Sequence, residues 1–194
     1  MNFFTADSHF SILDETIIPR DFRPFSSLEE MNEEIIKIWN KSAGEEDIIY
    51  HLGDFINYNS FDNKYYEDYF KMVKKIKAKV VLILGNNENK VLKSEFGGNF
   101  EKFKQFLIEL GFHEVVEKSM QINIGSKTYT LTHRPTDANM QSQFNLFAHI
   151  HKSGFVKKFG FNVGVDNHYF KLFSENDIIE LESRRKYFDE DVYI

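Results

Sequence analysis

The 194-residue chain has no cysteine, only three prolines and no long apolar run. Without cysteine it forms neither disulfide bonds nor thiolate metal sites. No segment reaches the ~18 consecutive apolar residues that span a bilayer, and the first residues, MNFFTAD, lack the basic segment of a signal peptide. We therefore expect a cytoplasmic protein with no membrane partner. The net charge of −6 separates the chain from typical basic nucleic-acid binders, although bound metal ions would still attract a nucleic-acid substrate.

Apolar material is abundant. Hydrophobic residues make up 42% of the chain and include 21 Phe and 9 Tyr, which is enough to build a sizeable core. No internal repeat and no Pro-rich or Ser-rich linker divides the chain. The sequence therefore predicts one domain over residues 1–194.

Helical and strand patterns alternate in the first half of the chain, and strands dominate the second half. Ser27 is a predicted N-cap for a helix with the apolar stripe Met31, Ile35, Ile36 and Trp39. Further helices are predicted over 65–77, 100–110 and 174–188. Strands are predicted over 47–52, 79–84, 113–118, 120–133, 145–150 and 161–165, with a hairpin turn at Gly125-Ser126. This order predicts a layered α/β fold with two sheets.

Seven residues with metal-binding side chains follow short apolar runs that are typical of buried strands. They are Asp7, His9, Asp54, Asn86, His133, His149 and His151. The carboxyl ends of strands are where sites assemble in open α/β sheets, so we expect these side chains to converge. Asp7 and His9 are two residues apart, as are His149 and His151. On extended backbone, each pair would point to one side.

The donor set mixes carboxylate, amide and imidazole groups, which suits Mn, Fe, Zn, Co or Ni better than Ca. Seven ligands are too many for one tetrahedral ion and suit two ions that share a carboxylate. Two divalent ions with two carboxylates leave a charge of +2, or +1 with a bridging hydroxide. Such a centre is electrophilic and also holds a nucleophile, as attack on a phosphoryl group requires.

The ordered motifs DSHF, RPF (23–25), WN (39–40), HLGD, GNNE, AHIH and NVGVD (162–166) make the chain resemble the calcineurin-like metallophosphoesterases, in particular their small single-domain bacterial and phage members. The resemblance covers residues 2 to about 180. It implies two facing mixed β-sheets flanked by helices, in a four-layer sandwich.

The resemblance also implies a function and a division of the ligands. The first metal would be bound by Asp7, His9, Asp54 and His151, and the second by Asp54, Asn86, His133 and His149. The activity implied is hydrolysis of a phosphomonoester or phosphodiester, with a metal-bridging hydroxide and with manganese as the favoured metal. The substrate would be a phosphoester, with nucleotides and nucleic acids among the candidates, and no obligate protein partner is evident.

Three positions depart from the family pattern. Asn87 stands where the family has a histidine that touches the phosphate and protonates the leaving group. As the candidate catalytic residue, Asn87 can donate a hydrogen bond to the phosphate but cannot deliver a proton near pH 7. Ser11-Ile12 replaces the usual Gly-His, and AHIH replaces GHTH with both ligands kept. The alternative is a catalytically weakened binding or scaffold protein on the same fold.

Other polar residues receive less specific roles. We expect His51 and His168 to be structural and His113 to lie on the surface. Arg134 is about equally suited to a phosphate contact and a surface salt bridge. The basic stretch 71–79 is interpreted as a solvated helix face. Cap or turn roles are expected for Asp62, Asp68, Asp137 and Asp166. Loops 10–27, 55–64 and 87–100 would select the substrate.

Overall fold

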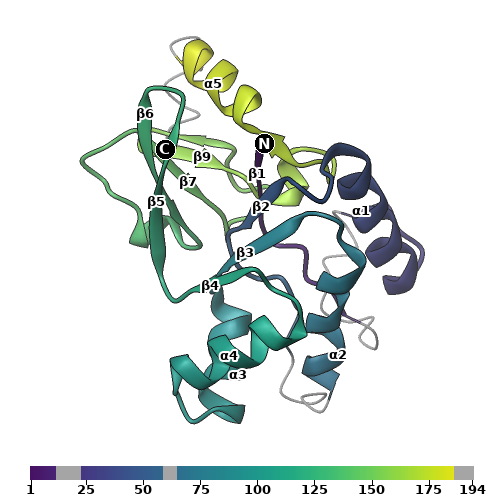
Figure 1. Ribbon diagram of the computed structural model, residues 1–194. Helices are drawn as coiled ribbons and strands as arrows, with labels where there is room; N and C mark the ends of the chain where they lie inside the picture. The colour runs from purple at the N-terminus through teal and green to yellow at the C-terminus, as the bar shows by residue number, and fades with distance from the viewer. Residues whose placement is uncertain (12–22, 59–64, 186–194) are drawn as a thin grey trace.

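Two five-stranded β-sheets form the centre of the computed structural model, which describes residues 1–11, 23–58 and 65–185 (Figure 1). The first sheet has the order β10-β1-β2-β3-β4, in which β1 to β4 are parallel and β10 is antiparallel to β1. Its strands are β1 (Asn2–Thr5), β2 (Ile48–His51), β3 (Lys79–Ile83), β4 (Glu114–Val116) and β10 (Phe173–Ser174).

The second sheet has the order β5-β6-β7-β9-β8 and is also mixed. Its strands are β5 (Ser119–Ile124), β6 (Lys127–Thr132), β7 (Asn145–Phe147), β8 (Val156–Lys157) and β9 (Gly160–Asn162). β5 and β6 form the predicted hairpin, in which Gly125 takes a φ of +57° that a side chain would disfavour. β6, β7 and β9 run parallel, so this sheet also has strands whose carboxyl ends lie together.

The helices are α1 (Leu28–Ser42), α2 (Tyr66–Phe70), α3 (Asn86–Glu95), α4 (Phe100–Leu110) and α5 (Glu175–Arg184), with 3-10 turns at Lys71–Lys75, Pro135–Asp137 and Val165–Asn167. Ser27 caps α1 as predicted, because its side chain accepts a hydrogen bond from the Glu30 N–H. Among the described residues, no helix combines the length and apolar composition that a membrane crossing requires.

Three predicted elements differ from the observed ones. The helix over 65–77 is α2 followed by a 3-10 turn. The helix over 174–188 begins after its N-cap Ser174, and residues 186–188 lie outside the described residues. The segment 87–100 was predicted as a loop, and this is wrong, because α3 occupies it up to Glu95. The first turn of α3 buries the polar residues Asn87 and Glu88, so its apolar periodicity is weak.

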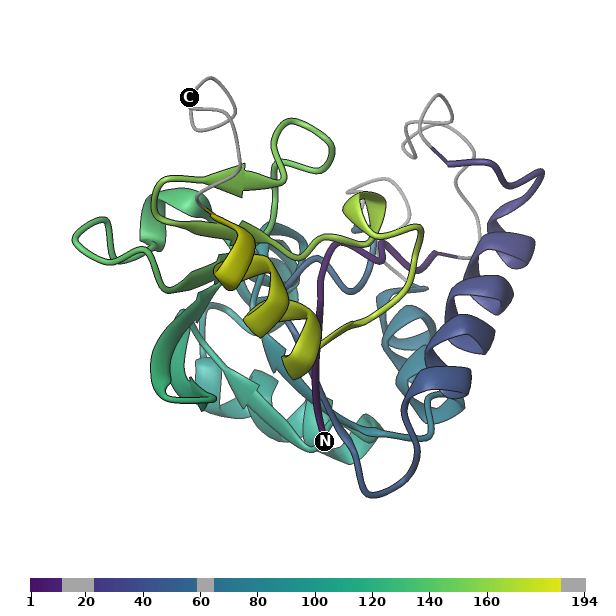
Figure 2. The same cartoon turned by 90° about the horizontal axis from the view of Figure 1, so that it is seen from above.

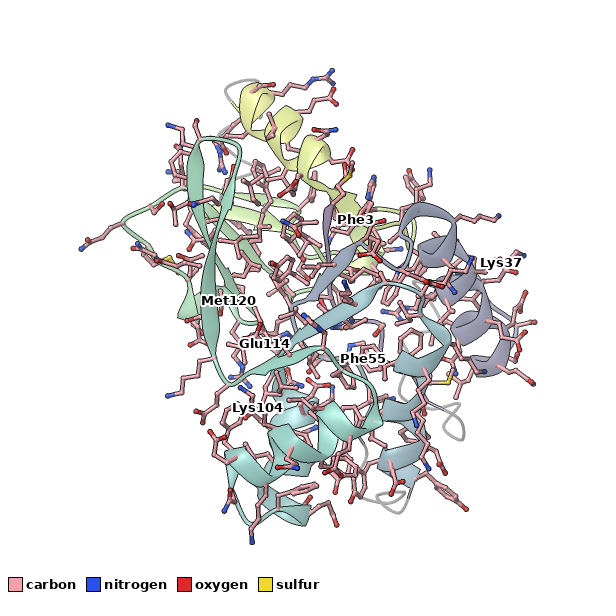
Figure 3. The ribbon with its side chains drawn as sticks, in the orientation of Figure 1. Phe3, Lys37, Phe55, Lys104, Glu114 and Met120 are labelled. Carbon is pink, nitrogen blue, oxygen red and sulfur yellow. The ribbon has the colours of Figure 1, made fainter. Side chains whose placement is uncertain are left out.

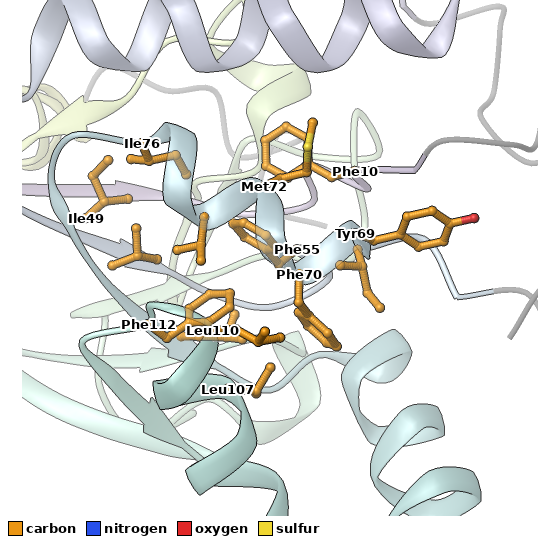
Figure 4. Close-up of a cluster of buried hydrophobic side chains, with 14 of the residues drawn as sticks. Phe10, Ile49, Phe55, Tyr69, Phe70, Met72, Ile76, Leu107, Leu110 and Phe112 are labelled. Atoms are coloured by element: carbon orange, nitrogen blue, oxygen red, sulfur yellow. The ribbon is translucent and has the colours of Figure 1, made fainter. Parts of the chain in front are cut away.

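Two hydrophobic cores lie on the two faces of the first sheet. One contains Phe10, Ile49, Phe55, Phe70 and Phe112 and fills the space toward α1, α2 and α4 (Figure 4). The other lies between the two sheets and contains Phe4, Leu52, Leu131, Leu146 and Phe161. Burial on both faces explains why the strands of the first sheet are almost continuously apolar.

The helices α1 to α4 lie on the far side of the first sheet from the second sheet, as two perpendicular views show (Figures 1 and 2). α5 lies along the edge of the sheets and sends Ile178 into the core between them. Lys37 on α1 extends into solvent, whereas Phe55 is fully buried (Figure 3). The structure is therefore an α/β fold of two mixed sheets flanked by helices.

Candidate metal centre

The seven predicted ligands lie where strands of both sheets end. Asp7 follows β1, Asp54 follows β2, and Asn86 follows β3 in the first sheet. His133 follows β6 in the second sheet, and His149 and His151 follow β7. Because these strands are parallel within each sheet, their carboxyl ends bring the side chains together.

Six of the seven residues form two groups of three. In each group, one ligand atom per residue lies within 4.8 Å of the others; the groups are Asp7, His9 and His151, and Asp54, His133 and His149. The two oxygens of Asp54 face in different directions. Oδ2 is 3.9 Å from His9 Nε2, and Oδ1 is 3.7 Å from His133 Nε2. Asp54 therefore lies between the two groups, where a shared ligand is expected.

The backbone at these positions is not extended as predicted. Asp7, His9, Asp54, His149 and His151 have φ values of 58°, 51°, 52°, 75° and 46°, in the left-handed region that non-glycine residues rarely adopt. Strained residues of this kind cluster at functional sites, where the surrounding structure holds them in place. Asp7 and His9 still reach one group, whereas His149 and His151 reach different groups. Both pairs do so through left-handed turns at the ends of the strands.

The first group contains buried polar atoms that no described residue partners. Asp7 Oδ2 accepts a hydrogen bond from the His149 N–H, whereas Asp7 Oδ1 and His9 Nε2 have no hydrogen-bond partner in the part of the chain that the structure describes. Burial raises the pKa of Asp7 to about 7 and lowers that of His9 to about 3. Buried polar atoms are normally satisfied, so two orphaned ligand atoms in one group fit a bound cation.

The second group is oriented by a fixed histidine tautomer. His133 Nδ1 donates a hydrogen bond to the Leu52 carbonyl at 2.8 Å, which leaves Nε2 with its lone pair. That lone pair faces Asn86 Oδ1 at 3.0 Å and His149 Nδ1 at 3.2 Å. A cation between three electron-rich atoms at this spacing would stabilise them, and Asn86 lies beside the second group.

His151 is oriented by Asp166, for which the sequence indicated only a cap or turn role. Asp166 Oδ2 accepts a hydrogen bond from His151 Nδ1 at 2.7 Å, and Arg23 pairs with the same carboxylate at 3.0 Å. Although burial opposes it, the hydrogen bond from His151 and the charge of Arg23 hold the pKa of Asp166 at about 2. His151 is thus fixed with Nε2 available for a metal, as outer carboxylates typically achieve.

Arg23 and Asn162 also belong to this support, and sequence reasoning assigned neither a role. Arg23 is buried and donates to the Asp7 and Ser8 carbonyls, while Asn162 donates to the His151 carbonyl at 2.8 Å. Arg23 belongs to RPF, and Asn162 and Asp166 belong to NVGVD. The sequence motifs therefore contained these three residues, but the motifs did not indicate which groups the residues contact.

Glu88 holds the loop that carries Asp54. Its carboxylate is fully buried and accepts hydrogen bonds from the backbone N–H groups of Gly85, Asp54, Phe55 and Ile56. Gly53 and Gly85 let the two loops touch, because a Cβ at Gly85 would lie 2.3 Å from Asp54 N. Sequence reasoning assigned no role to Glu88, because three of the four N–H groups that it accepts from lie in the loop after β2, more than 30 residues away.

Asn87 is buried beside the site. Its backbone N–H donates to Asp54 Oδ1 at 2.9 Å, and its side-chain oxygen accepts from the Tyr58 N–H at 3.3 Å. The amide orientation is therefore set by the loop after Asp54. The role of Asn87 toward a phosphate stays a prediction.

The remaining candidates are structural or exposed. His51 is buried and bonds Ser8 Oγ at 3.0 Å, His168 stacks on Phe173, and His113 is exposed. Asp68 pairs with Lys71, and Asp137 lies in an exposed 3-10 turn. Asp62 and Ile12 lie outside the described residues.

The chain is similar in sequence to a family profile and to a known protein. The family profile described as calcineurin-like phosphoesterase matches residues 3–189. An uncharacterised protein of Methanocaldococcus jannaschii is 33% identical over 129 residues, which are 66% of this chain and 61% of that protein, so the chain spans less than two thirds of its length.

Two solved structures match this chain to different degrees, and the first is similar in fold. A protein of unknown function from Aquifex aeolicus has a TM-score of 0.60 at 20% identity, covering 93% of this chain and 98% of the other. A structure described as a novel archaeal phosphodiesterase has a TM-score of 0.44 at 15% identity, covering 84% of this chain and 81% of the other.

Proposed function

Because the chain belongs to the calcineurin-like phosphoesterase family, we propose that it is a phosphoester hydrolase that depends on two divalent metal ions. The observation that carries the proposal is the position of Asp54, which belongs to the second ligand group and also faces His9 of the first. Among the described residues, the first group adds two buried ligand atoms without a hydrogen-bond partner. Asp7, His9, Asp54 and His151 would hold one ion. Asp54, Asn86, His133 and His149 would hold the other, with manganese as the expected metal.

The bound ions would supply positive charge for the phosphate oxygens and a water molecule of lowered pKa. The chain supplies the orientation of the ligands. Asp166 and the Leu52 carbonyl fix the tautomers of His151 and His133, and Glu88 holds the Asp54 loop. A site whose ligands are already fixed before the substrate binds needs little reorganisation energy when charge develops in the transition state.

Asn87 would position a phosphate oxygen through its amide N–H group. It cannot protonate the leaving oxygen, and general acid catalysis typically contributes about 10²–10⁴-fold. We therefore propose diesters, or monoesters with good leaving groups, as the best substrates.

The test is hydrolysis of bis-p-nitrophenyl phosphate and p-nitrophenyl phosphate by the manganese-loaded protein. Substitution of a residue that only orients a metal ligand typically lowers metal affinity or activity about 10–100-fold. Asp54 is itself a proposed ligand, so we expect Asp54→Asn to lower kcat/KM by more than about 100-fold. His113→Ala is the matched control, because His113 is exposed and lies in neither ligand group. Hydrolysis of neither compound by the wild type would count against the proposal and favour a binding or scaffold role.

A further inference from the structure

A cleft of about 720 Å³ borders the candidate metal centre. His133 of the second ligand group and the neighbouring Asn86 both line this cleft. Its other charged walls are four cations and two acids, namely Lys90, Lys93, Lys118, Arg134, Glu117 and Asp137. The cleft therefore has a net charge of +2, in a chain with a net charge of −6.

One face of α3 directs two of these cations into the cleft. Asn86, Asn89, Lys90 and Lys93 all line it, and their spacings of three, four and seven residues place them on one side of a helix. The same helix begins at the metal centre. The axis of α3 therefore leads from Asn86, beside the candidate metal centre, to Lys90 and Lys93, which lie about one and two turns further along the helix.

The facing walls carry the other two cations. Lys118 lies between β4 and β5, and Arg134 directly follows the candidate ligand His133. Arg134 and His133 line the same cleft, so Arg134 lies beside the candidate metal centre.

Within residues 1–11, 23–58 and 65–185, no ion pair engages Lys90, Lys93, Lys118 or Arg134. Other exposed lysines, including Lys37, Lys71 and Lys79, do pair with nearby carboxylates. The cleft cations are thus available for an anionic ligand. A substrate with a single phosphate would occupy the metal centre and leave them unused.

We propose that this cleft binds a second phosphate group of the substrate, so that the natural substrate is an organic phosphate with at least two phosphate or phosphodiester groups. The inference rests on the proposed function, since the first phosphate is the one hydrolysed at the metal centre. Nucleotides with more than one phosphate and short oligonucleotides share this chemistry.

The test compares the p-nitrophenyl ester of thymidine 5′-phosphate with and without a 3′-phosphate. We expect the wild type to prefer the ester with the 3′-phosphate. The variant Lys90→Gln/Lys93→Gln should lower this preference about fivefold at low salt, the effect of one or two exposed charge pairs. The control Lys74→Gln/Lys77→Gln removes two exposed charges three residues apart outside the cleft and should keep the preference.

A binding measurement keeps this inference separable from the proposed activity. Calorimetry with the manganese-loaded protein would compare thymidine 3′,5′-bisphosphate, thymidine 5′-monophosphate and a 5′-phosphorylated tetranucleotide. Tighter binding of the bisphosphate that is lost in Lys90→Gln/Lys93→Gln supports the inference even if no ester is hydrolysed. A further gain for the tetranucleotide identifies an oligonucleotide source, and its absence identifies a small nucleotide. Equal binding of mono- and bisphosphate by wild type and variant would overturn the inference.

Discussion

At the scale of single residues, the candidate ligands are held by contacts that remove their freedom. His133 and His151 each donate Nδ1–H to a fixed acceptor, the Leu52 carbonyl and the Asp166 carboxylate respectively. Five ligand residues sit in left-handed backbone, which costs of order 1–3 kcal/mol each for non-glycine residues. The surrounding structure must offset this cost. Residues that contact the candidate ligands should therefore affect metal affinity almost as much as the ligands themselves.

Asp166→Asn tests this support. The variant keeps an oxygen for the His151 N–H but loses the negative charge that pairs with buried Arg23. We expect manganese affinity and kcat/KM to fall by about 10–100-fold. Calorimetric metal titration measures the affinity, and Asp68→Asn, at an exposed salt bridge, is the control. Unchanged metal affinity in Asp166→Asn would show that Asp166 does not position His151.

Asn87→His tests the missing proton donor. A histidine there should accelerate phenyl phosphate hydrolysis more than p-nitrophenyl phosphate hydrolysis, because the poorer leaving group gains more from a proton. We expect a gain of about 10²-fold for the phenyl ester. Steady-state kinetics of both esters provide the measurement. No change with either ester would favour a binding or scaffold role.

At the scale of elements, the Glu88 side chain makes the largest number of hydrogen bonds between α3 and the loop after β2. Glu88 stands in the first turn of α3 and accepts hydrogen bonds from backbone N–H groups of both segments. Its fully buried carboxylate makes α3 a support for Asp54 as well as a wall of the cleft. The element most tied to the centre is therefore the one that periodicity did not predict.

Glu88→Gln should weaken this junction. A carboxamide has one acceptor oxygen instead of two and presents its own N–H groups to backbone donors. Each buried donor left unsatisfied costs about 1–3 kcal/mol, so we expect the free energy of unfolding to fall by at least about 2 kcal/mol. Urea denaturation of the metal-free protein measures it. Glu101→Gln, in the exposed first turn of α4, should change it by less than about 0.5 kcal/mol, and an equal effect in both variants would contradict the role of Glu88.

At the scale of the whole molecule, the fold buries four carboxyl groups at the meeting point of its two sheets. The side chains of Asp7, Asp54, Glu88 and Asp166 are all buried there, with Arg23 paired to Asp166. Burying unpaired carboxylates is costly, and a bound cation would relieve that cost. The stability of the molecule should therefore depend on metal and on pH together.

The sign of the pH dependence follows from the pKa values. Burial raises the pKa of Asp7 to about 7 and that of Glu88 to about 8, above those in the unfolded chain. Buried His9 and His51, with pKa values of about 3, are neutral in both states above neutral pH. From about pH 7 to pH 8.5 the folded state still binds protons that the unfolded chain has already released. The free energy of unfolding of the metal-free protein should therefore fall as the pH rises through this range.

Thermal melts in EDTA and in excess manganese, at several pH values across that range, provide the test. We expect manganese to raise the midpoint and to flatten its fall with pH, because a cation favours the ionised form of Asp7. Equal midpoints with and without metal would contradict a metal centre at these residues.

The convergence of the candidate ligands was predictable because they lie in ordered motifs at the ends of apolar strands, and five such motifs rarely occur together by chance. The tautomers, the left-handed backbone and the partners of Asp166 were not predictable in this way. His151 and Asp166 are close in sequence, but Arg23 comes from a segment more than a hundred residues away. Periodicity carries no information about such a pair.

The sequence by itself determined which residue types make up the candidate metal centre, the alternation of helices and strands, and the family. Those features are local, because the apolar pattern of each strand and the order of the motifs can be recognised from neighbouring residues in the sequence. Only the tertiary structure decided that Asp54 lies between the two groups, that Glu88 joins α3 to its loop, and that four cations share one cleft with the centre. These features arise from strands and loops that become neighbours only when the two sheets pack together.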